Sequence, residues 1–447
     1  MQIITLYNYL LFPLYLVIFF LIVRRKAKKY KGTPLKKFFL MAFWLHMFGA
    51  IFFAMLMQYY YGYADSFGYY IGGDIIRDMI SKDISAVKYL FYSGQDIVSA
   101  AEALNYGDKI PITMPNAANA FVMKVSAIFS FFSFGQYLVI SLFFGFISFI
   151  GTWKLFYVMQ KINKGRHIQL LGYATIATPS LWLWGSGLLK EPLCIGPLGL
   201  GIFLIYQIFI EKQFSFKKLL FLFFLFYVIS VIKSYITAIF IASVLIVLIT
   251  RVFFAIKNIV FRLLAIFLFI TISVIFLMSI NTDKYINEII VSSYSQIESF
   301  QNNYEVVQEM DEGSKAGFSI GNIKSSLSSM ILKSPQVIAS CLFRPFIWES
   351  GKIIILFAAL ESFVILLLTL FIFFKTKLVG FFYYAFNNPY RMFCFIFSML
   401  FALVVGYTTF NFGTMVRYKI IFLPFYFFLL INIYTALDFH KNSETIK

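Results

Sequence analysis

The sequence predicts an all-α protein, folded as a polytopic helical bundle in a membrane. Of its 447 residues, 61% are hydrophobic and only 13% are charged, and the mean hydropathy is +0.82. So little polar surface cannot cover a water-soluble globule of this size. The apolar runs are also long and continuous, whereas a membrane β-barrel needs short strands that alternate apolar and polar residues. Both observations favour α-helices that cross a bilayer.

The charge and the cysteines exclude several classes of protein. The net charge of +18 lies in short basic clusters between apolar runs, where Lys and Arg orient membrane helices, so we expect no nucleic-acid partner. The three cysteines Cys194, Cys341 and Cys394 have no paired spacing, which argues against a disulfide framework and a thiolate metal site. No small-residue cleavage site follows the first apolar run, so we interpret that run as a span.

With about twenty residues for each span, the sequence predicts about 11 transmembrane helices. The first ends in "RRKAKKYKGTPLKK", which holds eight basic residues and no acid, so this end is expected in the cytoplasm and the N-terminus outside. The later basic loops agree with that orientation and place the C-terminus in the cytoplasm. The predicted spans are 5–23, 38–58, 137–158, 169–185, 193–210, 218–232, 236–250, 262–280, 352–374, 392–408 and 420–437.

Two long extracytoplasmic loops, 59–118 and 281–351, complete the predicted topology. They hold 15 of the 20 acids, which concentrates negative charge on one face. Segments 119–135 and 323–343 are less suited to crossing the bilayer, and we interpret both as interfacial helices. No repeat of fixed period and no linker appears, so residues 1–447 are expected to form one integral-membrane domain.

The first acid of the first long loop, Asp65, is the strongest catalytic candidate. In "YGYADSFGYYIGGD", Asp65 follows the second span, and a carboxylate there can act as a general base on an acceptor hydroxyl. Tyr69 lies one helical turn later, and Gly72 and Gly73 would let a ligand approach the backbone closely. The structural alternative is that Asp65 caps a short helix.

Basic residues near the predicted outer ends of the spans are candidates for binding a phosphate. Charge near the hydrocarbon boundary is costly unless it faces water or a partner, and the planar fork of Arg donates two hydrogen bonds to phosphate. Snorkelling to headgroups and ordinary salt bridges are the alternatives. The candidates, with two acids that accompany them, are Lys190, Glu191, Lys233, Arg344, Glu349, Arg417 and Lys419.

A metal site has weaker support. Asp74 and Asp78 lie one turn apart and could hold a divalent cation, but a solvated helix face is the favoured interpretation. His46 lies within the second span and is expected to be a packed or hydrogen-bonded core residue. No P-loop or dinucleotide fingerprint occurs, so no cofactor is assigned.

These motifs resemble a known class of enzymes. The Asp65-Ser66-x-x-Tyr69 pattern resembles membrane glycosyltransferases of the GT-C superfamily, and "PSLWLWGSGLLKE", "LFRPFIWES" and "NFGTMVRYK" are similar to O-antigen or exopolysaccharide polymerase-like envelope proteins. The resemblance covers four short motifs in about 350 residues. It implies Asp65 as the base and later basic residues as ligands of a carrier phosphate. The chain departs from many GT-C enzymes in having no second acid beside Asp65 and no large soluble C-terminal domain.

The sequence thus predicts a glycosyltransferase of the bacterial inner membrane. It would transfer sugar from a polyprenyl-phosphate or polyprenyl-pyrophosphate carrier to a glycan acceptor at the periplasmic face, with Asp65, Arg344 and Arg417 in one cavity. A polymerase that transfers oligosaccharides en bloc, a lipid-linked glycan transporter and a non-catalytic scaffold remain alternatives. For the transporter, we find no internal repeat of the expected kind.

Overall fold

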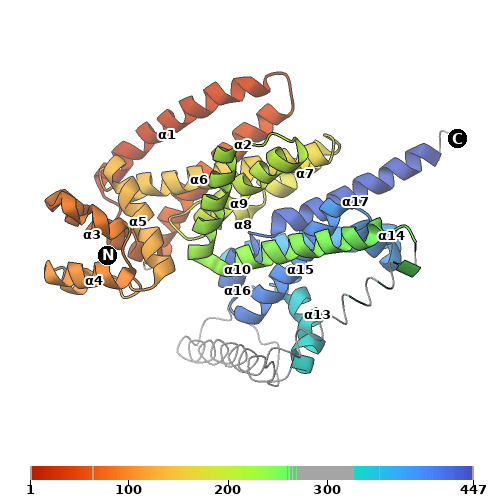
Figure 1. Ribbon diagram of the computed structural model, residues 1–447. Coiled ribbons are helices and arrows are strands. Elements are labelled where there is room, and N and C mark those ends of the chain that lie inside the picture. The colour runs from red at the N-terminus through yellow and green to blue at the C-terminus, as the bar shows by residue number, and fades with distance from the viewer. Residues whose placement is uncertain are drawn as a thin grey trace. The chain divides into compact units, whose positions relative to one another are not determined.

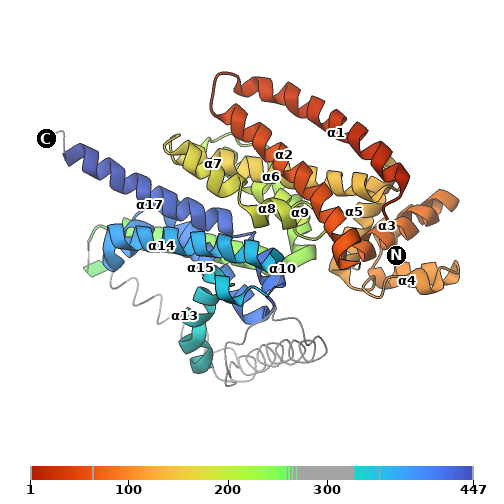
Figure 2. The same ribbon diagram turned by 180° about the vertical axis from the view of Figure 1, so that it is seen from behind.

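The computed structural model describes residues 3–258 and 327–444, apart from 63–64 and 352, together with a few isolated positions from 260 to 268. Every regular element in these ranges is helical, as Figures 1 and 2 show. The all-α prediction is therefore confirmed for the described residues. The chain divides into two compact units, Met1–Thr237 and Ala238–Lys447.

Unit 1 is organised around one central helix. Long α6 packs against α1, α2 and α9, and its buried residues lie on every side of the helix, including Tyr137, Phe144 and Phe156. Surrounded on all sides by protein, α6 needs no amphipathic pattern. The helices of this unit are α1 (Leu6–Ala27), α2 (Leu35–Leu56), α3 (Asp65–Lys82), α4 (Gly94–Ala103), α5 (Ala117–Phe132), α6 (Tyr137–Ile162), α7 (Ile168–Ile176), α8 (Pro179–Trp184), α9 (Pro192–Ile205) and the first part of α10 (Phe216–Ala255).

Unit 2 has a core rich in aromatic residues. Phe397 and Phe401 of α15 pack against Phe422 and Phe425, with ring centroids 4.8 Å apart for Phe397 and Phe425. Edge-to-face and offset packing of this kind stabilises aromatic pairs beyond their burial alone. The helices are the rest of α10 and α13 (Leu327–Phe343), α14 (Ile353–Phe386), α15 (Pro389–Thr408), α16 (Phe412–Lys419) and α17 (Leu423–Glu444).

Several of these helices can cross a membrane, but fewer than the sequence predicts. In the described ranges, seven helices are long and apolar enough, or eight if α16 and α17, which are bent by 60°, form one span. The protein therefore has membrane-spanning character, whereas the count of about 11 is wrong for the described residues. The seven are α1, α2, α6, α9, α10, α14 and α15.

The difference in span count has three sources. The predicted span 169–185 is split into α7 and α8, of nine and six residues, because the chain leaves the helix before Pro179. Spans 218–232 and 236–250 both fall within the 40 residues of α10, where Lys233 alone leaves the helical conformation. The predicted span 262–280 lies outside the described residues, apart from the isolated positions 264 and 268.

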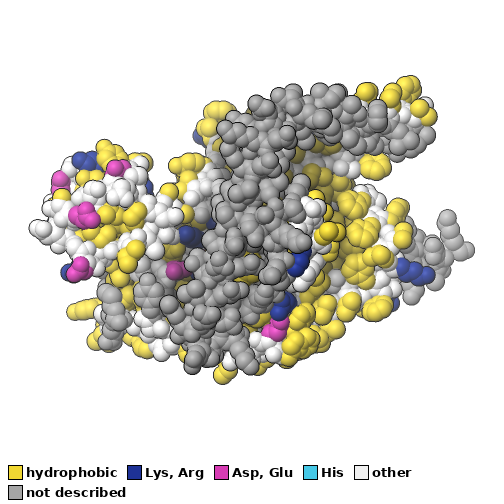
Figure 3. All heavy atoms as spheres, turned by 90° about the horizontal axis from the view of Figure 1, so that it is seen from below, with side chains coloured by type: hydrophobic (Ala, Val, Ile, Leu, Met, Phe, Trp, Pro, Cys, Tyr) yellow, Lys and Arg dark blue, Asp and Glu magenta, His cyan; other side chains and the backbone are white. Residues whose placement is uncertain are grey.

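The described parts of the two segments interpreted as interfacial are mainly helical, and neither helix is a candidate span. Helix α5 has 16 residues, and α13 has 17 with Pro335 inside. The long segment before α5 is itself folded, since α3 packs along α5 and α4 contacts both. A capping box between Ser93 and Asp96 starts α4, and Asn116 caps α5. Charged side chains gather over the α3 and α4 region in Figure 3.

Glycines bring α6 and α9 into backbone contact. A Cβ added at Gly199 would lie 2.0 Å from the carbonyl oxygen of Gly151, and one added at Gly151 would lie 2.5 Å from Gly196. Membrane helices depend on such small residues for close packing, because lipid supplies little hydrophobic drive for helix association. The α6–α9 interface is therefore intolerant of even one extra methyl group.

We expect Gly199→Ala to lower the stability of the folded protein by about 1–3 kcal/mol, because backbone must move to relieve the overlap. Thermal unfolding of the detergent-solubilised protein measures the change. Gly201→Ala is the matched control in the same helix, since the nearest atom to its added Cβ is the ring edge of Phe226, at 3.2 Å. Equal melting temperatures for the two variants would contradict this account of the interface.

Candidate functional site

Asp65 is the first residue of α3, and its side chain is exposed. A carboxylate in the first turn stabilises a helix by interacting with the positive end of the helix dipole. Asp65 therefore lies within the first turn of α3 and not at the cap position before it, so its structural role is this interaction with the helix dipole. Its exposure also leaves the carboxylate accessible from outside the protein, which a catalytic base requires.

Tyr69 faces the protein interior rather than a ligand. Its side chain is 4% exposed, and its hydroxyl donates a hydrogen bond to Oδ1 of Asn119 at 3.2 Å, which joins α3 to α5. The close approach expected at the neighbouring glycines is made by α5. A Cβ on Gly72 would lie 2.5 Å from Met123, and one on Gly73 would lie 2.7 Å from Ser126. These glycines therefore serve the packing of α3 against α5.

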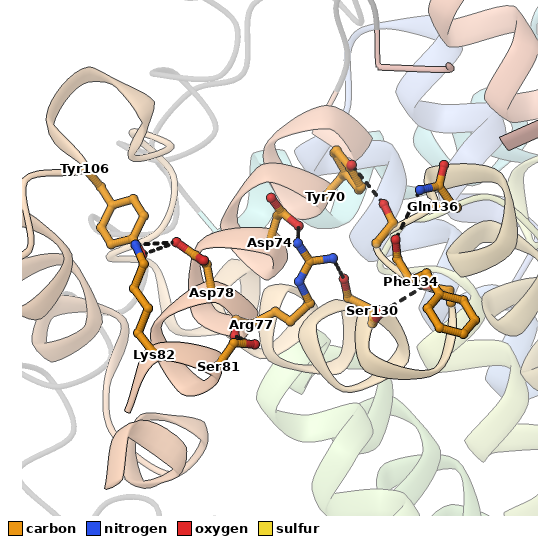
Figure 4. A network of polar contacts seen from close by, with 12 residues as sticks. Tyr70, Asp74, Arg77, Asp78, Ser81, Lys82, Tyr106, Ser130, Phe134 and Gln136 are labelled. Atoms are coloured by element: carbon orange, nitrogen blue, oxygen red, sulfur yellow. Dashed lines mark hydrogen bonds and ion pairs between the residues drawn. The ribbon is translucent and has the colours of Figure 1, made fainter. Parts of the chain in front are cut away.

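Asp74 and Asp78 each pair with a base on α3, as Figure 4 shows. Asp74 lies 2.6 Å from Arg77, which also donates to Ser130 of α5, and Asp78 lies 2.8 Å from Lys82. Burial raises the pKa of Asp74, although Arg77 opposes the shift. Hydrogen bonds from Lys82 and Tyr106 lower the pKa of Asp78. Within the described ranges, no three His, Cys, Asp or Glu side chains gather as metal ligands.

The most deeply buried charges of unit 1 form an ion pair. Nζ of Lys233 lies 2.8 Å from Oε1 of Glu191, and both residues are buried, Glu191 completely. Glu191 directly precedes α9, and Lys233 is the non-helical residue of α10, with φ −147° and ψ 82°. The pair therefore joins an irregular segment before α9 to the break in α10. The neighbouring Lys190 is only half-buried.

A second polar contact holds the same irregular segment. Nδ1 of His46, in α2, lies 2.7 Å from Oγ of Ser186, and both side chains are fully buried. Gly49, one turn further along α2, allows the backbone carbonyl of Trp182 to approach closely. The expectation that His46 is a hydrogen-bonded core residue is confirmed. Residues 185–191 are thus irregular backbone largely enclosed by protein, one of the settings in which such backbone is tolerated at membrane depth.

Arg344 and Glu349 form the principal ion pair of unit 2. Nε of Arg344 donates to both carboxylate oxygens of Glu349, at 2.9 and 3.1 Å, and Nη2 donates to Oε1. The backbone NH of Phe346 also donates to Glu349, at 2.8 Å. The guanidinium lies over the ring of Phe412, 5.6 Å from its centroid. The loop between α13 and α14 thus holds a partly exposed arginine, whose guanidinium already binds the carboxylate of Glu349.

Lys419 supports that loop from inside the protein. Its side chain is fully buried, and Nζ donates to the carbonyl of Arg344 at 3.1 Å and to Oγ of Ser362 at 2.7 Å. Ser362 donates in turn to the same carbonyl, at 3.2 Å. Glu361 interacts electrostatically with the Lys419 ammonium. Lys419 therefore positions the backbone at Arg344, and we assign it no direct contact with a ligand.

The predicted site residues thus fall into three groups. Asp65 and Tyr69 lie on α3, Glu191 and Lys233 form the buried pair, and the third group gathers around Arg344. Arg417 is half-buried on α16, two residues before Lys419. Asp65 belongs to unit 1 and the two arginines to unit 2, so their common cavity remains a prediction.

Three participants were not among the predicted site residues: Ser186, Ser362 and Phe412. The two serines are small polar residues in apolar surroundings, a pattern that indicates an internal hydrogen bond. Ser362 directly follows Glu361 in a predicted span, and Ser186 lies within "WGSG". Phe412 carried no signal of its own, because it is one of 59 phenylalanines.

We expect Lys233→Met to destabilise unit 1 by about 3–5 kcal/mol, because Glu191 would keep a buried charge without its cation. The double variant Glu191→Gln with Lys233→Met should recover most of this loss, since it removes both charges. Thermal unfolding in detergent measures all three proteins, with Lys190→Met as the control for losing a lysine nearby. If the single and double variants melt together, the ion pair does not determine the stability of this region.

The described part of the chain therefore contains one buried ion pair in unit 1 and a supported arginine in unit 2, and an exposed acid begins α3. All three features lie outside the regular interior of the long helices. The chain matches no family model, no curated protein and no solved structure.

Proposed function

We propose that the protein is a membrane glycosyltransferase of bacterial envelope polysaccharide assembly. It would transfer sugar from a polyprenyl-phosphate or polyprenyl-pyrophosphate carrier to a glycan acceptor at the outer face of the inner membrane. The observation that carries the proposal is the supported arginine of unit 2. Arg344 holds a carboxylate with its fork, and a phosphate oxygen pair presents similar geometry to the same donors.

The leaving group gives the cations their role. As the bond from the sugar to the carrier breaks, negative charge grows on the phosphate, and preorganised cations stabilise that charge. Arg344 and Arg417 would act on the phosphate, with Glu349 yielding its place on the fork. Lys419 would hold the backbone of Arg344 in position through the 3.1 Å contact described above.

Asp65 would supply the base. Its carboxylate would take the proton of the acceptor hydroxyl as that oxygen attacks the sugar carbon. The exposed position at the start of α3 supports this role, because an acceptor glycan approaches from the aqueous side. Tyr69 would act only through packing of α3 on α5.

A transporter of lipid-linked glycans is the second candidate. Its support is the Glu191–Lys233 pair at a break in α10 beside the irregular segment 185–191. Discontinuous helices and buried charges are typical of transport pathways. A polymerase that moves whole oligosaccharides would use the same arginines without a strict need for Asp65.

Asp65→Asn should lower glycan extension by about 10²–10⁴-fold, as expected when a catalytic base is lost. The assay follows product formation from carrier-linked glycan by the full-length protein in liposomes, without an ion gradient. Asp108→Asn is the control, since Asp108 is another exposed acid in the same outer segment.

The outcomes separate the candidates. Product formation that survives Asp65→Asn but is lost in Arg344→Gln would favour the polymerase and remove Asp65 from the mechanism. Movement of the labelled carrier across the bilayer without any product would favour the transporter. Equal activity in all variants would contradict both proposed roles.

A further inference from the structure

Unit 2 contains a cavity of about 570 Å³ at the end of three membrane-spanning helices. It lies where α10 ends, α14 ends and α15 begins. The wall combines polar side chains of Thr250, Arg251 and Asn387 with apolar side chains of Phe254, Phe386 and Met392. The cavity contains none of the candidate residues described above.

The wall is backed by a buried arginine. Arg391 is 6% exposed, and its Nη2 donates to Oδ1 of Asn387, which lines the cavity. Its guanidinium also lies 5.8 Å from the ring centroid of Tyr384, but its buried Nε has no hydrogen-bond partner among the described residues. None of the ion pairs between described residues includes Arg391.

The sequence around the cavity offers no anion. No Asp or Glu occurs from residue 212 to 282 or from 362 to 437, and these stretches contain every residue of the wall. A buried cation is costly without a counter-charge, so an anion from outside the chain would be favoured here. The start of α15 adds to this preference, because Pro389 lines the cavity and a helix N-terminus attracts negative charge.

We propose that this cavity binds the phosphate-bearing headgroup of an acidic membrane lipid. Arg251 would contact the phosphate directly, and Arg391 would contribute charge and orient Asn387. Acyl chains would leave along Phe254 and Phe386, whose side chains are exposed. A free phosphate would interact with the same cations, but it has no apolar part that could contact Phe254 and Phe386. Arg251 in the wall and the nearby Lys257 and Arg391 make this region basic. The predicted topology assigns it to the cytoplasmic leaflet, where acidic lipids provide the surface charge.

Binding to the purified full-length protein tests this site independently of any transferase activity. The detergent-solubilised protein is titrated with phosphatidylglycerol, with phosphatidylcholine of the same chains and with inorganic phosphate, and bound lipid is counted by native mass spectrometry. We expect phosphatidylglycerol to bind at least about tenfold more tightly than phosphatidylcholine. Arg251→Gln should abolish that preference, and Lys257→Gln is the matched control, because Lys257 is an exposed cation nearby that does not line the cavity.

Each result decides the proposal. A preference for phosphatidylglycerol that is lost in Arg251→Gln and kept in Lys257→Gln supports it. Equal binding of the two lipids, or an unchanged preference in Arg251→Gln, overturns it. Inorganic phosphate that protects the protein from heat through Arg251, with no lipid preference, assigns the site to a free anion and overturns the lipid. Arg391→Lys provides a second variant, which keeps the buried charge but loses the fork to Asn387.

Discussion

The energetic cost of removing charge from water governs the arrangement of polar residues in this protein. Glu191 and Lys233 are separated by 42 residues, yet their side chains meet at 2.8 Å in the interior of unit 1. Neither charge would be stable there alone, since the lost hydration is repaid only by a close and well-oriented partner. The same contact anchors residues 185–191, and the His46–Ser186 hydrogen bond anchors them from another helix. The irregular segment is therefore fixed at two residues, Ser186 and Glu191, each by a buried polar contact with another helix.

Unit 2 handles a buried lysine differently. Lys419 donates to a backbone carbonyl and a serine, and Glu361 acts on it through space. The closest ion pair of the described part of unit 2 is instead that between Glu349 and Arg344, in the partly exposed loop. This division keeps the interior lysine as a structural support and leaves the arginine where a ligand can reach it. The sequence favoured Arg344 over Lys419 as a phosphate ligand, and the burial of Lys419 agrees with that ranking.

Hydropathy was a sound guide to the helices and a poorer guide to their number. Long apolar runs such as α6 must be helical in a membrane, because every backbone polar group needs an internal partner. By contrast, the helix break before Pro179 divides a run that hydropathy treats as one span. The two spans that hydropathy predicts on either side of Lys233 belong to one long helix, α10, with a break at that residue. The partners of charged residues were harder to foresee, since they depend on contacts between distant segments. A salt bridge from Arg344 to Glu349 was among the structural alternatives considered from the sequence, whereas the contact of Lys419 with Ser362, 57 residues away, had no local signal.

The backbone contact between α6 and α9 restricts how unit 1 can change shape. Where side chains separate two helices, rotamers can adjust and the helices can slide, but Gly151 and Gly199 leave no such layer. The two helices are therefore expected to behave as a single rigid strut. A rearrangement during a working cycle would be easiest at residues with non-helical backbone, and Lys233, which pairs with Glu191 at the start of α9, is one of them.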